Sequence, residues 1–271
     1  MEMNVYDYSE ELEFISKIAK DSSLIYMNAD RSEYSLKNNA VGVFDIVTNS
    51  DVSTENHIIN EIKKQYPNDL FICEEKTNDD LTNERTWIID PIDGTVNYCR
   101  GIPLFGTQLA LLVNKIPVLA LIYLPSNDEL YTATEKNGAR LNGVLLKITD
   151  ERPINECIIS LSDFSRKCQY FRDMQAKLIL NMYDCVARLK IFGASCCDFG
   201  MLASGKIDIH IRFVNNVWDY IPGLYISKKA GAYVDEELLK NEKFLLIGSS
   251  KKICNDFRLN VIKNLFEVQH E

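Results

Sequence analysis

Residues 87–95, which read WIIDPIDGT, constrain the fold of this chain more than any other stretch. They pass directly from apolar residues into two carboxylates, a glycine and a hydroxyl. Because Pro91 has a fixed φ and no N–H, we expect a tight turn there rather than a continuing strand. The carboxylates of Asp90 and Asp93 would then face one point in space. Hard divalent cations such as Mg²⁺ prefer oxygen ligands of this kind, together with water and substrate phosphate.

Gly94 and Thr95, which complete this stretch, suit an anion. Gly94 lets the backbone approach a phosphate closely, and its N–H with that of Thr95 can bind phosphate oxygens. Thr95 would also place a hydroxyl beside a metal ion bound by these carboxylates. Aspartate and glycine are common turn residues, however, so the motif Asp-x-x-Asp-Gly alone fits a purely structural turn at least as well.

Other carboxylates lie at comparable places. The predicted strand Leu70–Cys73 ends in Glu74, just as the strand 86–89 ends in Asp90, and open sheets gather their chemistry at such strand ends. Asp51 stands ahead of a predicted helix that Ser53 or Thr54 would cap. A lone aspartate at such a place is more often a cap than a catalytic group. The same two interpretations apply to Asp219, which follows Trp218 at the start of another predicted helix.

Hydrophobic periodicity places the remaining elements. We expect a first helix from Ser9, as its cap, to about Met27, and a polar, mobile loop over residues 30–44. Beyond residue 150 strands and helices alternate, ending in a helix over residues 257–266. This pattern predicts an α+β lobe of residues 1–150 that carries most metal ligands, fused to an α/β lobe of residues 151–271 that supplies Asp219 and the specificity residues.

The net charge of the chain argues against some classes of binding partner. A formal net charge of -9 over 271 residues argues against non-specific attraction to nucleic acid or to an anionic membrane surface. An acidic protein that handles an anionic substrate needs a positive group in its site, and a bound metal cation is the obvious candidate. The N-terminus does not resemble an export signal, and no apolar run is long enough to cross a bilayer, so we expect a cytoplasmic protein.

At several separate places, in the same order, the chain resembles the inositol monophosphatase family of Mg²⁺-dependent, lithium-sensitive sugar phosphatases. The resemblance implies a layered α-β-α-β-α sandwich, a homodimer and inhibition by Li⁺. It covers nearly the full chain. The matching segments are 45–48 through Asp51, Glu74-Glu75, 87–95 with Asn97 and Tyr98, Gly138-Ala139 with Asn142-Gly143, 193–195, Trp218-Asp219 with Pro222, and Ala230-Gly231.

The family pattern, carried over to these positions, implies a site for two to three Mg²⁺ ions. Glu74, Asp90 and the carbonyl of Ile92 would hold one ion, and Glu74 would also help to hold a weaker third. Asp90, Asp93 and Asp219 would hold the second. Thr95, hydrogen-bonded to Asp51, would activate a water on the metal for in-line attack on phosphorus. The residues implied in substrate binding are Gly94, Thr95, Ser195 and Arg212.

Two positions depart from the family pattern. Where members selective for inositol carry a glutamate, this chain has Arg212, whose planar fork suits a second phosphate or a carboxylate better than a neutral polyol. An exposed arginine on a strand edge is the alternative interpretation. The family's usual lysine before Asp45 has no counterpart in register, although Lys37 lies nearby.

The sequence therefore predicts a Mg²⁺-dependent phosphomonoesterase that acts on a small sugar or polyol phosphate, such as inositol 1-phosphate. Phosphatase activity on 3′-phosphoadenosine 5′-phosphate, fructose 1,6-bisphosphate or NADP remains an alternative. A phosphocysteine or aspartyl-phosphate mechanism lacks its motif, and so does a nucleotide-binding loop. A protein that only binds or regulates a partner is a further alternative, but it has little physical reason to keep carboxylates that repel one another.

Overall fold

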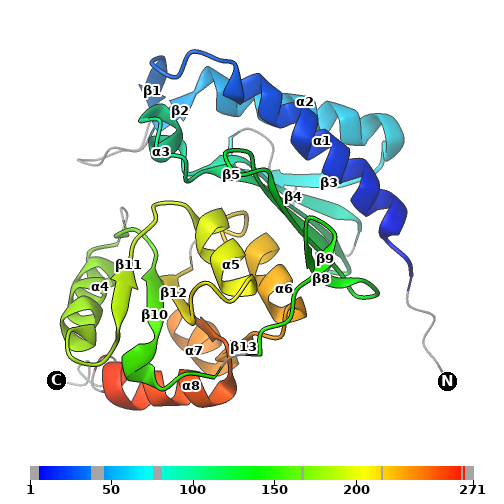
Figure 1. Ribbon diagram of the computed structural model, residues 1–271. Coiled ribbons are helices and arrows are strands. Elements are labelled where there is room, and N and C mark those ends of the chain that lie inside the picture. The colour runs from blue at the N-terminus through cyan, green and yellow to red at the C-terminus, as the bar shows by residue number, and fades with distance from the viewer. Residues whose placement is uncertain are drawn as a thin grey trace.

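Two β-sheets organise the chain (Figure 1). The computed structural model describes residues 6–37, 46–75, 81–82, 84–149, 151–165, 168–214, 216–263 and 265. Over this part of the chain, the larger sheet has seven strands, each beside its neighbour in sequence. In order they are β3 (Leu70–Cys73), β4 (Thr86–Asp93), β5 (Gly106–Val113), β6 (Ile116–Leu124), β7 (Glu129–Thr134), β8 (Gly138–Leu141) and β9 (Val144–Leu145). Only the β3–β4 pair in this sheet is parallel.

The second sheet has five strands in the order β11 (Arg188–Lys190), β10 (Ile158–Leu161), β12 (Ile209–Phe213), β14 (Phe244–Gly248) and β13 (Tyr233–Val234). β10 is parallel to both β11 and β12, whereas β14 is antiparallel to its neighbours. A small separate ladder joins β1 (Tyr34–Leu36) to β2 (Ile46–Thr48).

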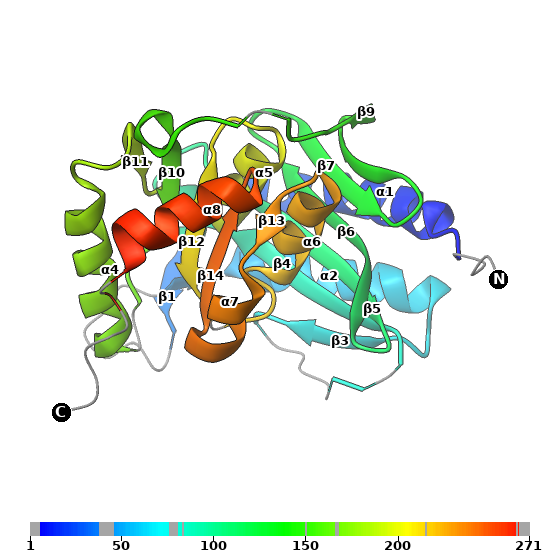
Figure 2. The ribbon, with the colours of Figure 1, turned by 90° about the horizontal axis from the view of Figure 1, so that it is seen from below.

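The helices complete five layers (Figures 1 and 2). They are α1 (Ser9–Met27), α2 (Asn49–Gln65), α3 (Thr95–Cys99), α4 (Gln169–Met182), α5 (Ser195–Ala203), α6 (Ile221–Lys229), α7 (Glu236–Glu242) and α8 (Lys251–Phe257), with short turns η1 (Ile154–Glu156) and η2 (Arg258–Ile262). Helices α1 and α2 cover the outer face of the larger sheet, and α5 and α6 lie between the two sheets. Helices α4, α7 and α8 cover the far side of the second sheet (Figure 2). The predicted α-β-α-β-α sandwich is confirmed.

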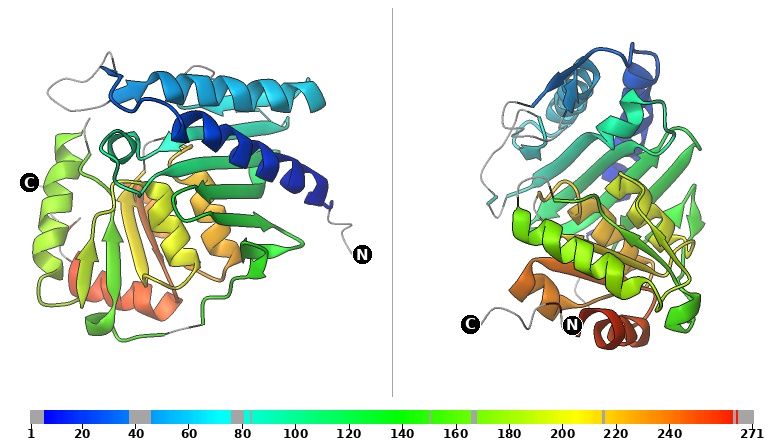
Figure 3. Two further views of the ribbon diagram at one scale, coloured as in Figure 1. Left: turned by 45° about the horizontal axis from the view of Figure 1, so that its top comes forward. Right: turned by 90° about the vertical axis from the view of Figure 1, so that its left-hand side faces the viewer.

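Alternation along the strands explains why both sheets are buried on both faces. On β4 and β5, Trp87, Ile89 and Leu109 pack against α1 and α2, whereas Ile88 and Ala110 pack toward α5 and α6. Figure 3 shows the helices lying across both faces of the larger sheet. In the described part of the chain, no helix is both long and apolar enough to cross a membrane.

Three expectations about helix and loop boundaries were wrong. α2 begins at Asn49, because Thr48 rather than Ser53 or Thr54 caps it, so Asp51 lies inside its first turn. The first helix has Tyr8 rather than Ser9 at its N-cap position, because the Asp7 carboxylate accepts the Ser9 N–H. The expected loop over residues 30–44 contains strand β1, which pairs with β2.

The end of the chain also differs from the prediction. The closing helix was expected over residues 257–266, but α8 and the π-helical turn η2 together occupy residues 251–262. The Ser250 hydroxyl accepts the Ile253 N–H and so fixes the earlier start. The apolar side chains of Phe257 and Val261, which suggested the later helix, do pack into the core under the second sheet.

Candidate active site

A bulge in β4 brings Asp90 and Asp93 to the same face of the larger sheet. The expected tight turn at Pro91 was wrong, because β4 continues to Asp93. Its register against β5 shifts on the way, since Asp90 pairs with Gln108 and Asp93 with Gly106. Side chains three residues apart on a regular strand point to opposite faces, and one extra residue restores a common direction. The bulge therefore gives the two carboxylates the common direction that the predicted turn was expected to give them.

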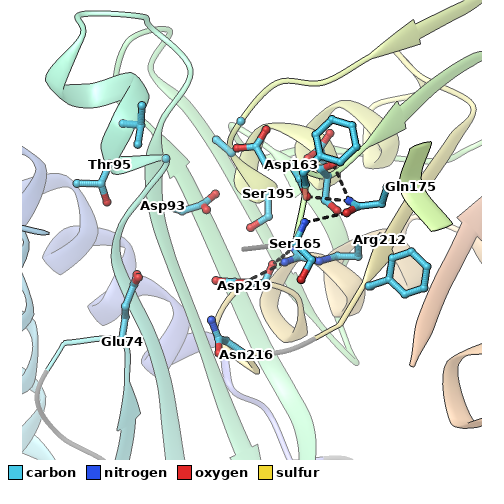
Figure 4. Close-up of a pocket in the computed structure, with 18 of the residues that line it drawn as sticks. Glu74, Asp93, Thr95, Asp163, Ser165, Gln175, Ser195, Arg212, Asn216 and Asp219 are labelled. Atoms are coloured by element: carbon cyan, nitrogen blue, oxygen red, sulfur yellow. Dashed lines mark hydrogen bonds and ion pairs between the residues drawn. The ribbon is translucent and has the colours of Figure 1, made fainter. Parts of the chain in front are cut away.

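The carboxylate of Asp93 lies at a pocket of about 250 Å³ between the two sheets (Figure 4). Glu74, Asp93 and Thr95 line it from the larger sheet, and Arg212 and Asp219 line it from the side of the second sheet. The pocket thus joins residues from the two halves of the chain, Asp219 among them.

The start of α5 holds the loop after β4 in place. The Cys196 N–H donates to Asp93 Oδ2 at 2.5 Å, so the helix N-terminus faces this carboxylate. Gly94 has a φ of 85°, and a Cβ there would lie 2.8 Å from the Cβ of Ala194 and 2.9 Å from the carbonyl oxygen of Leu104. Both the left-handed conformation and the close contact therefore require glycine.

The side chains of Thr95 and Asp51 are in contact at the N-terminus of α2. The Thr95 hydroxyl lies 3.3 Å from Asp51 Oδ1 and 3.1 Å from the carbonyl oxygen of Ile92. The other oxygen of Asp51 accepts the Thr48 N–H at 2.7 Å and the Thr48 hydroxyl at 2.5 Å, which completes a capping box. Asp51 is therefore both a helix cap and a partner of Thr95. Burial raises its pKa to about 6.

We call Glu74, Asp90, Asp93 and Asp219 the acidic cluster. Asp90 is only 1% exposed, and its Oδ1 has no hydrogen-bond partner among the described residues. Burial raises the pKa of Asp90 well above its usual range, and the charges of the other three acids raise it further. Such mutual repulsion in a buried place calls for a cation.

Two side-chain cations contact the ends of the acidic cluster. Lys37 Nζ donates to Glu74 Oε1 at 2.7 Å and to Glu75 Oε1 at 2.8 Å, so this lysine reaches the site although it is out of register with the family pattern. Arg212 Nη2 donates to Asp219 Oδ2 at 3.1 Å, and its Nη1 donates to the main-chain carbonyl of Asp219 at 2.9 Å. Burial raises the pKa of Asp219 to about 6, and Arg212 opposes that rise.

The donor set of the acidic cluster fits a hard divalent cation. Carboxylate oxygens are the ligands that Mg²⁺ takes, and Asp90 Oδ1 is a buried acceptor that no described residue satisfies. Among the described residues, no group of three or more His, Cys, Asp or Glu side chains is arranged closely enough to hold a metal ion. We attribute this to Lys37 and Arg212, which hold the carboxylates of Glu74 and Asp219 toward themselves.

Ser195 and Arg212 both line the pocket, as a role in substrate binding requires. The Ser195 hydroxyl accepts a hydrogen bond of 2.8 Å from Gln108 Nε2 on β5. Arg212 is 7% exposed, so the interpretation as an exposed arginine on a strand edge was wrong. Asp45, part of the matching segment ahead of Asp51, lies outside the described residues.

Sequence reasoning missed the far wall of the pocket, which residues 162–165 form. Gln175 on α4 holds this segment: its Oε1 accepts the Ser165 N–H at 2.8 Å, and its Nε2 donates to the carbonyls of Asp163 at 2.8 Å and Ser162 at 3.3 Å. Figure 4 shows Gln175, which also lines the pocket, bonded to this segment. A glutamine beside Met174 on the apolar face of a predicted helix was the available signal.

Comparison with known proteins agrees with this geometry. The model of the inositol monophosphatase family matches residues 7–254. An inositol monophosphatase of Dictyostelium discoideum is 36% identical over 201 residues, which cover 72% of this chain and 73% of that protein. A fructose-1,6-bisphosphatase/inositol-1-monophosphatase of Thermotoga maritima is 31% identical over 195 residues, which cover 72% of this chain and 73% of that one. The solved structure of a Thermotoga maritima IMPase superimposes with a TM-score of 0.82 at 26% identity and covers 95% of this chain and 98% of that one.

Proposed function

The chain belongs to the inositol monophosphatase family, a family of phosphoric monoester hydrolases, and we propose that it is a Mg²⁺-dependent phosphomonoesterase of small sugar or polyol phosphates. The observation that carries this proposal is a pocket lined by Glu74, Asp93 and Asp219 of the acidic cluster together with Thr95, whose hydroxyl contacts Asp51. A phosphate ester would be repelled by these acids alone, so the proposal includes a cation between them.

Two to three Mg²⁺ ions would be held by the acidic cluster. Glu74, Asp90 and the carbonyl of Ile92 would hold one, with Glu74 also supporting a third, and Asp90, Asp93 and Asp219 would hold another. When bound, such ions neutralise the charge of the phosphate and make water a stronger nucleophile. The start of α5 keeps one oxygen of Asp93 in a fixed direction through the Cys196 N–H, which leaves the carboxylate little freedom to rotate.

Thr95 and Asp51 would move the proton. The Thr95 hydroxyl can pass its proton to Asp51 Oδ1, 3.3 Å away, and then accept one from the attacking water. Asp51 must be ionised to accept it. Thr48 favours this ionised form, because it donates its N–H and its hydroxyl to the carboxylate. The backbone N–H groups of Gly94 and Thr95 would bind the phosphate oxygens.

The alcohol part of the substrate would lie toward Ser195 and Arg212. Two of the N–H groups of Arg212 are bonded to Asp219, and a guanidinium has five, so others remain for an anionic group. This favours a substrate with a second phosphate or a carboxylate, and the relative from Thermotoga maritima carries fructose-1,6-bisphosphatase in its name. Fructose 1,6-bisphosphate, 3′-phosphoadenosine 5′-phosphate and NADP are therefore the alternatives to an inositol phosphate.

Phosphate release from a panel of monoesters, with Mg²⁺ and with chelator, tests the proposal. We expect turnover with Mg²⁺ only, and Asp90→Asn to lower kcat/KM about a thousand-fold or more, because it removes charge from the centre of the acidic cluster. Asp21→Asn, which makes the same change on the exposed surface of α1, should leave kcat/KM unchanged. Full activity of Asp90→Asn would disprove the proposed metal site.

Several finer expectations stay predictions from the sequence. They are the homodimer, the cytoplasmic location and the inhibition by Li⁺. We also propose that residues 1–150 supply most metal ligands, and that residues 151–271 supply Asp219 and the specificity residues.

A further inference from the structure

Arg212 lines the pocket and interacts with two carboxylates that come from different elements. Its two terminal nitrogens bond the side chain and the main chain of Asp219 (Figure 4). The second carboxylate is that of Asp198 on α5, which also lines the pocket and is 2% exposed. The charge of Arg212 lowers the pKa of the Asp198 carboxyl, so the two groups interact electrostatically.

Asp198 is the weaker counter-ion of the two. Burial raises its pKa well above the usual range, against the influence of Arg212. Its neighbour His210, whose Nδ1 lies 3.7 Å from Asp198 Oδ1 and 2.7 Å from the Ser160 hydroxyl, adds no positive charge, because burial lowers the His210 pKa well below its usual range. The positive charge of Arg212 is therefore balanced mainly by Asp219.

The guanidinium has little freedom to leave this place. Arg212 is 7% exposed, and its Nε has no hydrogen-bond partner among the described residues, so its contacts with Asp219 are the bonds that fix its outer end. Neither bond uses Oδ1 of Asp219. The same carboxylate can thus bind a metal ion through Oδ1 and keep the arginine on Oδ2, at the cost of repulsion between the two cations.

We propose that Arg212 is a built-in counter-ion of Asp219 that weakens the binding of a divalent cation at this carboxylate. The inference rests on the proposed function, because it takes Asp219 as a metal ligand. Partners that support a metal ligand usually make it more basic, as a carboxylate does for a histidine. Arg212 does the opposite, since a positive charge bonded to a carboxylate lowers its attraction for a second cation.

Calorimetric titration with Mn²⁺, without substrate, tests the proposal directly. We expect Arg212→Gln, which keeps a hydrogen-bond donor but removes the charge, to lower about ten-fold the Kd of the Mn²⁺ site that includes Asp219, which is the site that Asp219→Asn alone weakens. Arg212→Met is a second neutral variant and should behave in the same way, should Arg212→Gln fold poorly. Arg212→Lys keeps the charge and should stay close to the wild type. Combined with Asp219→Asn, the Arg212→Gln change should have no effect on the Mn²⁺ sites that remain.

A matched control removes the same charge elsewhere. Lys228→Gln breaks the exposed ion pair between Lys228 on α6 and Glu236 on α7, and it should leave every Mn²⁺ Kd unchanged, which excludes an effect of net charge. Unchanged or weaker Mn²⁺ binding by the neutral Arg212 variants overturns the inference and leaves the phosphatase proposal standing. Absence of Mn²⁺ binding by the wild-type chain overturns both.

Discussion

At the β4 end of the pocket, three of the proposed reacting residues come from one short stretch of chain, whereas the Arg212 end is built from several segments. Asp90, Asp93 and Thr95 all lie within residues 90–95, and the bulge in β4 alone gives the two aspartates a common direction. At the other end, Arg212 on β12 meets Asp219 and the segment 162–165, which come from separate elements. In the proposed function, the β4 end carries most of the reaction, Asp219 at the other end completes the metal ligands, and Arg212 with the segment 162–165 sets substrate choice.

After the loss of a metal ligand at Asp90, the largest effect should come from Thr95, at the β4 end. Thr95→Val keeps the shape of the side chain but removes the hydroxyl that contacts Asp51 Oδ1. We expect kcat to fall about 100- to 1,000-fold for every substrate, because proton transfer typically contributes that much. Steady-state kinetics on the panel of monoesters would measure it. A fall that differs greatly between substrates would contradict the division between the two ends.

The pH profile sharpens this prediction. Burial raises the pKa of Asp51 to about 6, so its carboxyl is protonated below that pH and cannot accept a proton. Activity should therefore fall as the pH decreases through about 6. Thr95→Ser, which restores a hydroxyl, should regain most of the lost kcat and show the same acidic limb.

A smaller and more selective effect should come from Arg212. Arg212→Glu is expected to change the ratio of kcat/KM between a substrate with a second anionic group and a neutral polyol phosphate about ten-fold, in favour of the polyol. The ratio is the proper measure, because any effect on metal binding is common to both substrates and cancels. An unchanged ratio would show that Arg212 does not contact the part of the substrate that leaves.

The same contrast explains what could be predicted from the sequence. The β4 end is encoded by contiguous residues, so its acids and hydroxyl could be identified before the structure was known. The error at Pro91 concerned local geometry. A proline has no N–H to pair, but the ladder between β4 and β5 is interrupted at this bulge. β4 therefore tolerates the proline and continues. The start of α2 was missed because Thr48 caps the helix from the end of β2.

The Arg212 end could be predicted only in part, because its contacts are not local. Arg212 was singled out as a departure from the family pattern, but its bonds to Asp219 depend on how β12 and the turn before α6 meet. Gln175 was missed altogether, since nothing in the sequence links a helix residue to the backbone of residues 162–165. Such contacts depend on the packing of α4 against the second sheet.

The smallest effect on kcat should come from Gln175. Its single amide satisfies one N–H and two carbonyls of the segment 162–165, and Gln175→Leu would leave these groups without their partner. We expect the free energy of unfolding to fall by about 1–3 kcal/mol, the cost of an unsatisfied buried polar group. Because the far wall of the pocket would then be less ordered, KM should rise several-fold while kcat stays within about two-fold.

Gln169→Leu provides the matched control for this last change. Gln169 is exposed on the same helix, and among the described residues its side chain bonds Asp173 and Arg172, so its replacement should alter neither KM nor stability appreciably. The measurement is a comparison of kcat and KM with thermal unfolding for both variants. If Gln175→Leu lowered kcat as much as Thr95→Val does, the far wall would take part in the reaction itself. The Arg212 end could then no longer be treated as a separate determinant of substrate choice.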